Sequence, residues 1–298
     1  MEADRLRGEI EAAGWRVVDR GTDFALSPAS PPDVEVQGRV RYGSSVSVPS
    51  RLDEAPVGLV SVVAVATEHP QDFERALGPL RDHAPDGTQL IVVANDPSPE
   101  QAAALEAIDA VDAGGPGVAT ELVWTSSRLG HAAALNAGIR RASAAVVVLI
   151  DTSVESTGDA LTPLVAALDE ASVAVAGGWG IVSDDLRRFR EAPPGDVDAI
   201  EGYWLAFRRA DYAERGPLDE AFRFYRNLDI WWSLVLRDGG DDGPNGRAVA
   251  LEGLPLLRHE HRGYAALPDA ERDRLSKRNF YRIIDRFGSR GDLVTSGD

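Results

Sequence analysis

The chain has 298 residues, of which 44% are hydrophobic, and this suffices for one large α/β domain or two smaller ones. Its net charge of −17 argues against nucleic acid or an anionic membrane surface as a partner, because both need a basic face. The absence of cysteine excludes disulfides, thiolate catalysis and zinc–thiolate sites, and it is typical of the reducing cytoplasm, where we expect this protein.

The first 55 residues are expected to form a small α+β element of their own. An amphipathic helix is predicted over residues 4–13, where charged and apolar residues alternate as they do not in a signal peptide. Short strand-like segments follow at residues 15–19, 23–27 and 34–42. A polar linker over residues 50–56 ends this element, and no motif within it indicates chemistry.

From residue 57 onward, apolar strands alternate with amphipathic helices. Strands are predicted at residues 57–67, 89–95, 120–125 and 144–151, and helices at residues 70–84, 98–111 and 129–142. A capping box supports the second helix, with Ser98 as N-cap and Gln101 three residues later. Four strands joined by three crossovers predict a mostly parallel sheet with helices on its faces. None of the apolar runs is long enough to cross a bilayer.

The second half of the chain is less regular. A helix over residues 159–170 and a strand over residues 173–178 continue the alternation, and a last helix is predicted over residues 269–287. Between them lies an irregular segment rich in tryptophan. A doubly wound first half followed by an aromatic, irregular half is typical of a nucleotide site beside a variable substrate site.

The fourth strand ends on the polar sequence Asp151-Thr152-Ser153. The carboxyl ends of strands in open α/β sheets face the ligand crevice, so we expect Asp151 to face a ligand that needs oxygen atoms. The alternative is that Asp151 only caps a turn.

The glycine-rich dinucleotide turn and the phosphate loop are both missing after the first strand, which disfavours hydride transfer and ATP hydrolysis. A nucleotidyltransferase would also need a glycine-rich loop there, and the sequence TEHPQD does not provide one.

Six segments, in order along about residues 59–287, resemble motifs of one enzyme family. They are SVVAVATEHP, VVANDPSPE, RLGHAAALNAGIRRA, LIDTSVESTGDALTPLVAAL, the segment from EGYWLAFRRADY to LVLRDGG, and HEHRGY with SKRNFYRIIDRFG. Together they resemble family 2 inverting glycosyltransferases of the GT-A fold.

This resemblance implies a GT-A-type doubly wound, mostly parallel sheet over residues 56–298, behind the small N-terminal α+β extension. Residues 56–178 would bind the nucleotide sugar and residues 179–298 the acceptor. The implied reaction moves a sugar from a nucleoside-diphosphate sugar, with UDP as the expected nucleotide, to a carbohydrate or other hydroxyl acceptor with inversion.

The resemblance also implies a divalent metal, Mn²⁺ or Mg²⁺, that neutralises the diphosphate leaving group. The family holds it with an Asp-x-Asp motif, but in this chain the second aspartate is Ser153, a weaker neutral ligand. Asp151 then meets the metal or the ribose, and His259 or His261 is a candidate to complete the site. The alternative is that both histidines are ordinary surface residues.

The catalytic base of the family lies in a Glu-Asp motif, and this chain has Asn227 there, which cannot act as a base. Asp229 matches a second acidic position and is the best remaining base, although on a helix it points about 200° away from residue 227. Alternatively, Asp229 only satisfies the helix dipole. Ser153 and Asn227 together keep open a degenerate transferase that binds nucleotide sugar or a partner without turnover.

The resemblance assigns supporting roles to further residues. At the ends of the first two strands, the base and ribose are expected to contact Thr67, Glu68, Asn95 and Asp96, of which the last two are also common turn formers.

Arg128 is expected to contact the diphosphate, whereas Gly130 and Asn136 either line the nucleotide-sugar site or allow close helix packing. Trp204, Trp231 and Trp232 either form a stacking face for the acceptor or belong to the core.

Overall fold

The computed structural model describes residues 5–7, 10, 15–20, 23–28, 30–112, 118, 120–240 and 243–295. Of the helix predicted over residues 4–13, residues 5–7 and 10 are helical and the remainder lies outside the described residues.

The main element is a ten-stranded sheet. Its strands, in spatial order, are β13 (Gly195–Val197), β16 (Arg247–Ala250), β10 (Val173–Gly177), β15 (Trp204–Arg208), β8 (Val146–Ile150), β5 (Val60–Ala66), β6 (Thr88–Ala94), β7 (Thr120–Thr125), β4 (Arg39–Tyr42) and β3 (Val34–Val36). The shorter strands are β1 (Trp15–Arg20), β2 (Asp23–Pro28), β9 (Val154–Ser156), β11 (Gly180–Ser183), β12 (Phe189–Ala192), β14 (Ala199–Ile200) and β17 (Leu256–Arg258). The helices are α2 (Pro70–His83), α3 (Pro99–Asp112), α4 (His131–Ile139), α5 (Thr162–Leu168), α6 (Arg209–Arg215), α7 (Leu228–Arg237), α8 (Arg262–Ala265) and α9 (Asp269–Phe287).

The predicted mostly parallel sheet is confirmed. Strands β8, β5, β6, β7 and β4 run parallel to one another, and β10 runs parallel to β16. The one antiparallel strand inside the sheet is β15, which pairs with β8 on one side and β10 on the other. Because β15 is antiparallel to both neighbours, β8 and β10 point the same way, and their carboxyl ends lie at the same edge of the sheet.

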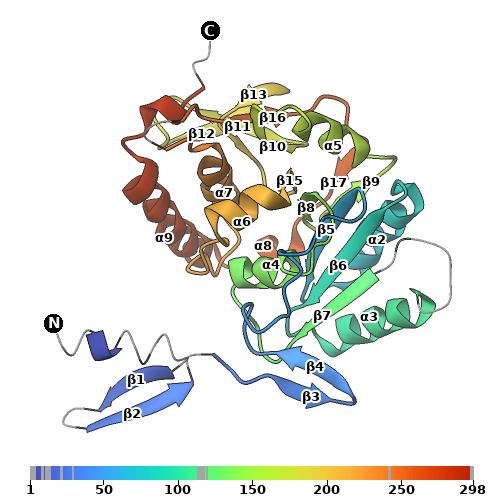
Figure 1. Cartoon of the computed structure of the whole chain (residues 1–298), viewed down its shortest axis with the longest axis vertical. Helices are drawn as coiled ribbons and strands as arrows, with labels where there is room; N and C mark the ends of the chain where they lie inside the picture. The colour runs from blue at the N-terminus through green and yellow to red at the C-terminus, as the bar shows by residue number, and fades with distance from the viewer. Residues whose placement is uncertain are drawn as a thin grey trace.

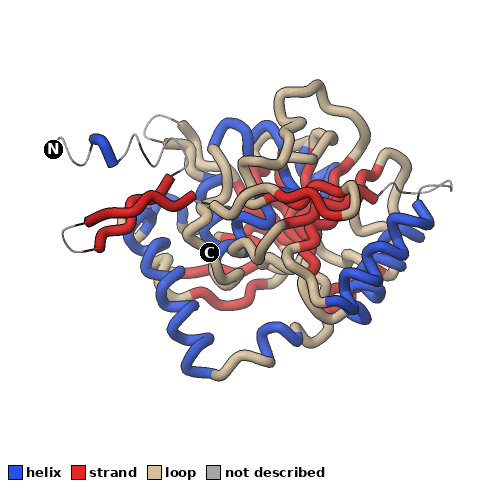
Figure 2. The backbone as a smooth tube through the Cα atoms, turned by 90° about the horizontal axis from the view of Figure 1, so that it is seen from below, coloured by secondary structure: helices blue, strands red, loops and turns tan. Residues whose placement is uncertain are grey.

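Helices cover both faces of the sheet, and Figure 2 shows the strands in the middle with helices on either side. The buried side chains divide by the two-residue period of the strands. On one face, Val63, Ile91 and Leu149 pack with residues of α4, α7 and α9. On the other face, Val62, Val92 and Val148 pack with residues of α2, α3 and α5. The strands are apolar on both sides because both sides are covered, as is typical of parallel sheets.

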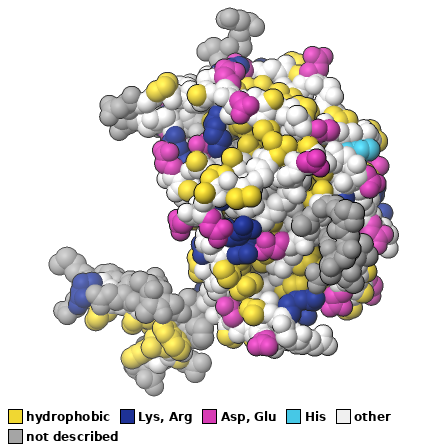
Figure 3. Space-filling view, turned by 45° about the vertical axis from the view of Figure 1, so that its right-hand side comes forward, with side chains coloured by type: hydrophobic (Ala, Val, Ile, Leu, Met, Phe, Trp, Pro, Cys, Tyr) yellow, Lys and Arg dark blue, Asp and Glu magenta, His cyan; other side chains and the backbone are white. Residues whose placement is uncertain are grey.

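The N-terminal 55 residues do not form a single separate element in the structure. Strands β1 and β2 make a hairpin that projects from the main body (Figure 1). Trp15, Phe24 and Leu26 on it are exposed, and Figure 3 shows hydrophobic side chains on the surface of this projection. Strands β3 and β4, in contrast, belong to the main sheet, since β4 pairs in parallel with β7. Residues 34–42, expected in the N-terminal element, therefore pair with the main sheet and not with the hairpin.

The segment predicted as a polar linker, residues 50–56, is fixed to the main domain by buried polar contacts. Arg209 is 4% exposed and donates hydrogen bonds to the carbonyls of Arg51, Glu54 and Ala142 at 2.6–3.1 Å. The amide of Arg51 donates to the carbonyl of Arg140 at 2.7 Å. One guanidinium thus holds the linker, the end of α4 and the start of α6 together.

Replacing Arg209 by methionine should lower the free energy of unfolding by roughly 2–4 kcal/mol, because it leaves three carbonyls without their shared donor. Urea denaturation of both proteins measures the difference. Arg274→Met is the matched control: Arg274 is exposed and makes only an i,i+3 ion pair with Glu271, so its loss should change stability by no more than about 0.5 kcal/mol. Equal effects of the two substitutions would contradict the assignment.

Candidate functional site

A cleft of about 520 Å³ opens at the carboxyl end of β8. Its polar lining includes Asp151, directly after β8, and Asp229, in the first turn of α7. His131 at the start of α4, Tyr225 and His261 complete this group. The cleft thus brings together residues from widely separated parts of the chain, at the edge where an open α/β sheet binds its ligands.

Both carboxylate oxygens of Asp151 are hydrogen-bonded within the chain. Oδ1 accepts from the amide of Ser153 at 2.8 Å and from its hydroxyl at 2.5 Å, while Oδ2 lies 3.2 Å from Nε2 of His261. Burial alone would raise the pKa of Asp151, but the hydrogen bond and charge of His261, with the two bonds from Ser153, hold this pKa below its usual value. Asp151 is therefore an anion held in a fixed orientation.

His261 is positioned by α8 and by an aromatic neighbour. Its Nδ1 accepts a hydrogen bond from the amide of Tyr264 at 3.0 Å, so a proton on Nε2 satisfies both this contact and the one to Asp151. Its ring stacks on Tyr225 at 4.7 Å between centroids. Burial would lower the pKa of His261, but the bond to Asp151 and the charge of Asp151 outweigh it and raise this pKa.

His131 lies beside this pair and stays neutral. Burial lowers its pKa from 6.5 to about 4, even though Asp151 acts in the opposite direction. Its ring meets Tyr225 edge-on, with 6.0 Å between centroids. A neutral imidazole at the floor of the cleft can accept or donate a hydrogen bond without adding charge.

Asp229 has the opposite electrostatic character to Asp151. Burial raises its pKa, while amide hydrogen bonds from Gly202 and Ile230, both at 2.9 Å, and the charge of Arg226 oppose the shift. A Cβ on Gly202 would lie 3.2 Å from the Cβ of Asp229, so glycine there allows the close approach. Asp229 is thus held at the cleft wall by the turn that precedes β15.

Asn227, the other residue of the predicted catalytic pair, is turned toward α9. It lies in the left-handed region with φ 69°, and its Nδ2 donates to the carbonyl of Ser276 at 3.0 Å. Asparagine tolerates this conformation better than most residues. The side chain therefore has a clear structural contact, although the residue also lines the cleft.

The residues predicted to bind the base and ribose lie at the ends of β5 and β6, along the rim beyond the cleft lining. Glu68 and Arg128 form an exposed ion pair at 2.8 Å. Asn95 is buried and bonds through its side chain to both backbone groups of Leu129, which fixes the loop before α4.

Thr67 and Asp96 follow β5 and β6 directly, Thr67 partly buried and Asp96 exposed. The backbone of Asp96 has φ 50°, and its amide donates to the hydroxyl of Thr125 at 3.0 Å. Both residues stay candidates for nucleotide contact, because they lie at the ligand-binding edge of the sheet.

Asn136 and Gly130 serve packing in this structure. Asn136 is 1% exposed, and its side-chain amide bonds to both backbone groups of Leu218 and to the hydroxyl of Tyr212. A Cβ on Gly130 would lie 3.0 Å from the Cα of Arg223, so the residue allows this segment to approach α4. For both positions the geometry favours the packing alternative over contact with a nucleotide.

The three tryptophans do not form one surface. Trp204 packs on the α2 face of the sheet, whereas Trp231 and Trp232 pack on the α9 face, and none is more than 7% exposed. A sugar cannot stack on side chains that lie on opposite faces of the sheet. This geometry favours the core alternative, although Trp232 reaches the inner wall of the cleft.

Strand β17 pairs with β9 and brings His259 to Ser153 and Glu155. Nε2 of His259 lies 2.9 Å from a carboxylate oxygen of Glu155, and its amide donates to the carbonyl of Ser153 at 2.8 Å. Of the two predicted histidine ligands, only His261 contacts Asp151.

A family model supplies the identity. The model described as glycosyl transferase family 2 matches residues 61–225, which is more than half of the chain. The chain belongs to glycosyl transferase family 2. The matched range includes Asp151 and ends at Tyr225, so Asp229 and His261 lie beyond it. No curated protein matches the chain.

Solved glycosyltransferases share the fold of this family 2 chain. GalNAc-T7 with UDP, GalNAc and Mn²⁺ is 14% identical with a TM-score of 0.64, covering 79% of this chain and 50% of its own. Mannosyltransferase PcManGT from Pyrobaculum calidifontis, with GDP-Man and Mn²⁺, is 18% identical with a TM-score of 0.58, covering 83% and 71%. TarS from S. aureus in complex with UDP is 11% identical with a TM-score of 0.50, covering 78% and 73%. At such identities the likeness shows the GT-A fold alone. The chain spans half the length of GalNAc-T7.

The site of this family 2 chain offers a partial set of metal ligands. Within the described residues, no three His, Cys, Asp or Glu side chains come together as a metal site. Asp151 Oδ2 and His261 Nε2 lie 3.2 Å apart, a separation that fits two ligands each about 2.1 Å from one cation. To bind a cation, Nε2 must give up the proton that it shares with Asp151; with the proton on Nδ1 instead, the amide of Tyr264 keeps its hydrogen bond to the carbonyl of His261 at 3.0 Å. Since Mg²⁺ and similar ions often use one or two protein ligands plus substrate phosphates, this pair fits a metal that arrives with the donor.

His131 and Tyr225 do not stand out in the sequence, and neither does the Gly202 amide. The available signal for His131 is its place after Gly130, at the start of a helix on the ligand-binding edge. Tyr225 and Gly202 give no such signal, because their roles arise from contacts with distant residues. Within the described part of the chain, no helix is both long and apolar enough to cross a membrane.

The lowered pKa of His131 predicts a loss of stability in acid. Between pH 6.5 and about 4 the unfolded chain binds a proton that the folded chain does not, so stability should fall by up to roughly 3 kcal/mol as the pH drops. Chemical denaturation of wild type and His131→Gln across this range measures the effect, which the variant should lack. Asp229 and Glu201, whose pKa values are raised, act in the opposite direction as the pH rises above their ordinary values, and they are present in both proteins.

Two other neighbouring groups titrate outside the window of His131. His261, with a raised pKa, changes stability above pH 6.5, and Asp151, with a lowered one, changes it below pH 3.8. His83→Gln, at an exposed position at the end of α2, is the control and should retain the wild-type slope. An identical slope in His131→Gln would contradict the prediction.

Proposed function

We propose that this protein transfers a sugar from a nucleoside-diphosphate sugar to a hydroxyl acceptor with inversion, and that the donor is UDP-linked. The observation that carries the proposal is the pair of unlike carboxylates in one cleft: Asp151, with a lowered pKa, and Asp229, with a raised one. In many active sites, the surroundings of two acidic groups shift their pKa values in opposite directions. One group then stays ionised and stabilises charge, while the other transfers a proton.

In the proposed reaction, Asp151 and His261 contribute to binding the nucleoside-diphosphate sugar. This pair would hold a divalent cation, which would supply positive charge to neutralise the diphosphate leaving group. Ser153 keeps the Asp151 carboxylate in place through its amide and hydroxyl. Mn²⁺ with nucleotide sugars or their components in the GalNAc-T7 and PcManGT structures supports a metal at this site, and UDP in GalNAc-T7 and TarS supports the choice of nucleotide.

Asp229 is the proposed base that takes the proton of the acceptor hydroxyl. The raised pKa makes its carboxylate a stronger base than an ordinary aspartate, which suits this task. The amides of Gly202 and Ile230 orient it, and Arg226 keeps the anionic form accessible. The offset of about 200° expected for two residues of one helix does not apply to this pair, because Asn227 precedes α7 in a left-handed conformation. Asn227 faces α9 while Asp229 faces Gly202, which supports Asp229 rather than Asn227 as the base.

The first test is metal-dependent nucleotide binding. Asp151→Ala should lower the affinity for UDP measured by calorimetry with Mn²⁺ by about tenfold or more, to the level of wild type without metal. Glu155→Gln is the matched control, since Glu155 pairs with His259 outside the cleft lining. An Asp151→Ala protein that keeps its response to Mn²⁺ would remove Asp151 from the site.

The second test concerns the base. Asp229→Asn should lower kcat by about 10²–10⁴-fold while leaving UDP affinity unchanged, because an amide cannot accept the proton. Nucleotide release from a panel of UDP-sugars and GDP-mannose, with and without sugar acceptors, measures turnover. Asp211→Asn removes another first-turn carboxylate, on α6, and should have no effect.

The same panel of donors also tests the alternative that this protein is a degenerate transferase, which Ser153 and Asn227 suggest. A wild-type protein that binds UDP but releases no nucleotide from any donor would favour binding without turnover. Full activity of Asp229→Asn would instead show that the base lies elsewhere.

A further inference from the structure

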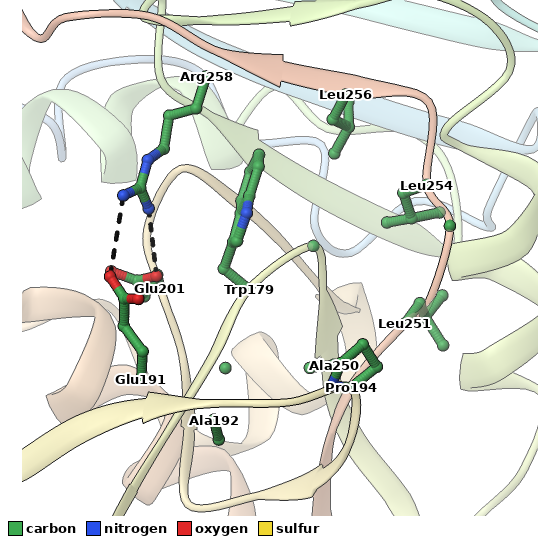
Figure 4. Close-up of a pocket in the computed structure, with 13 residues that line it drawn as sticks. Trp179, Glu191, Ala192, Pro194, Glu201, Ala250, Leu251, Leu254, Leu256 and Arg258 are labelled. Atoms are coloured by element: carbon green, nitrogen blue, oxygen red, sulfur yellow. Dashed lines mark hydrogen bonds and ion pairs between the residues drawn. The ribbon is translucent and has the colours of Figure 1, made fainter.

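A second cavity, of about 470 Å³, opens beside the cleft (Figure 4). It lies at the carboxyl ends of β10 and β16, where Gly178 and Leu251 follow the two strands. Its volume falls within the range of about 300–1,000 Å³ that is typical of small-molecule sites. The transfer reaction proposed above assigns no role to this cavity.

The topology of the sheet places the two cavities side by side. The cleft lies at the end of β8 and the second cavity at the end of β10, and only β15 separates these strands. Because β15 is antiparallel, its first residue lies at this same edge, together with the turn that precedes it. Residues 201–203 of that turn therefore form the boundary between the cavities.

The second cavity is built around Trp179, which lies between Gly178 and Gly180. A Cβ on Gly178 would lie 3.0 Å from a methyl of Leu256, and one on Gly180 would lie 2.5 Å from Val197. Larger residues on either side of the tryptophan would thus collide with the surrounding walls. Trp179 is partly exposed, and the ring of Tyr203 supports it edge-on at 5.9 Å.

The walls on the two sides of Trp179 differ in chemistry. In Figure 4 the leucines lie on one side of Trp179 and the charged side chains on the other. The leucines are Leu251, Leu254 and Leu256, and the charged residues are Glu191, Glu201 and Arg258. Arg258 lies 3.5 Å from Glu201 and 3.9 Å from Glu191, separations that leave hydrogen-bonding capacity on all three groups. The guanidinium also lies over Tyr203, 4.7 Å from its centroid.

The charged wall is common to both cavities, since Glu191, Glu201 and Arg258 line each of them. Glu201 is joined directly to Gly202, whose amide donates to Asp229. A ligand bound on the charged wall is therefore next to the turn that holds the proposed catalytic base.

We propose that the second cavity binds the sugar ring of a carbohydrate acceptor, with one face of the ring on Trp179 and its hydroxyls on Glu191, Glu201 and Arg258. This inference rests on the proposed transfer reaction, and it names the acceptor class of that reaction. The ring would direct one hydroxyl across the charged wall toward Asp229.

A pyranoside matches this lining better than other small molecules do. Its C–H face is apolar and suits an indole ring, while its hydroxyls both donate to carboxylates and accept from a guanidinium. A flat apolar ligand would cover the carboxylates of Glu191 and Glu201 without offering them a hydrogen bond, which is unfavourable. An anionic ligand would bring charge repulsion from the same two groups.

Saturation-transfer difference NMR with the full chain tests the assignment. The probes are methyl pyranosides of glucose, galactose, mannose, N-acetylglucosamine and N-acetylgalactosamine in both anomeric forms, with phenol as the apolar probe. At least one pyranoside should bind with millimolar affinity, with the strongest signals from the protons of a single ring face. Adding UDP with Mn²⁺ should not displace it, because the nucleotide occupies the neighbouring cleft.

Substitutions in the second cavity test whether the pyranoside binds there. Trp179→Ala should weaken it by about tenfold or more, and Trp179→Phe should retain part of it, since a smaller aromatic ring remains. Ala192→Phe, which fills the cavity from β12 without removing a packing group, should abolish the signal even if Trp179→Ala fails to fold. Trp15→Ala is the control, because Trp15 is exposed on the N-terminal hairpin.

The outcomes separate this inference from the proposed function. No pyranoside signal from a protein that binds UDP would overturn the acceptor site and leave the transferase proposal standing. Binding of phenol alone, or pyranoside binding that survives both Trp179→Ala and Ala192→Phe, would also overturn it. Pyranoside binding at Trp179 without any UDP binding would confirm a sugar site and refute the transfer reaction instead.

Discussion

The candidate site depends on one antiparallel strand inside a parallel sheet. Strand β15 lies between β8 and β10, so its first residue reaches the edge where the parallel strands end. The turn before it therefore passes between the two cavities, and its Gly202 amide holds Asp229. A parallel strand at this position would place its amino end at the opposite edge, and the carboxylate on α7 would lose this contact.

The electrostatics of the cleft follow from how each carboxylate is bonded. Asp151 receives two hydrogen bonds from Ser153 and faces His261, which together outweigh the cost of burial. Asp229 receives only neutral amide hydrogen bonds, and burial dominates. The same residue type thus has opposite pKa shifts within one cleft, because the contacts with Ser153 and His261 outweigh burial at Asp151, whereas two amides and the charge of Arg226 do not outweigh it at Asp229.

Local sequence patterns predict the helices and strands, but they do not predict the contacts between them. The central strands and helices follow from apolar periodicity, and the backbone amide of Gln101 donates to the hydroxyl of Ser98, which is one half of the predicted capping box. The side chain of Gln101 does not return the bond, because the amide of Ser98 donates to the carbonyl of Thr67. The joining of β4 to β7 and of β17 to β9 is not encoded locally, since it pairs segments some 80 to 100 residues apart. For the same reason the sequence could place Asp151 at the ligand edge but could not distinguish His261 from His259. It also could not show that Trp204 lies on the other face of the sheet from Trp231.

Ser153 stands where the resemblance implies a second aspartate, and a serine there changes the electrostatics of the cleft. Two carboxylates that converge on one point repel each other, and one of them tends to take up a proton unless a cation is present. A hydroxyl removes this repulsion and donates a hydrogen bond instead, so Asp151 stays ionised and oriented by the chain itself. His261 adds a second contact on the other oxygen, in the direction from which a cation would be bound. In the proposed reaction, a donor diphosphate with its metal would bind beside a carboxylate and its hydrogen-bonded imidazole rather than between two anions. The substitution therefore lowers the charge available to a metal while it increases the order of the carboxylate that remains.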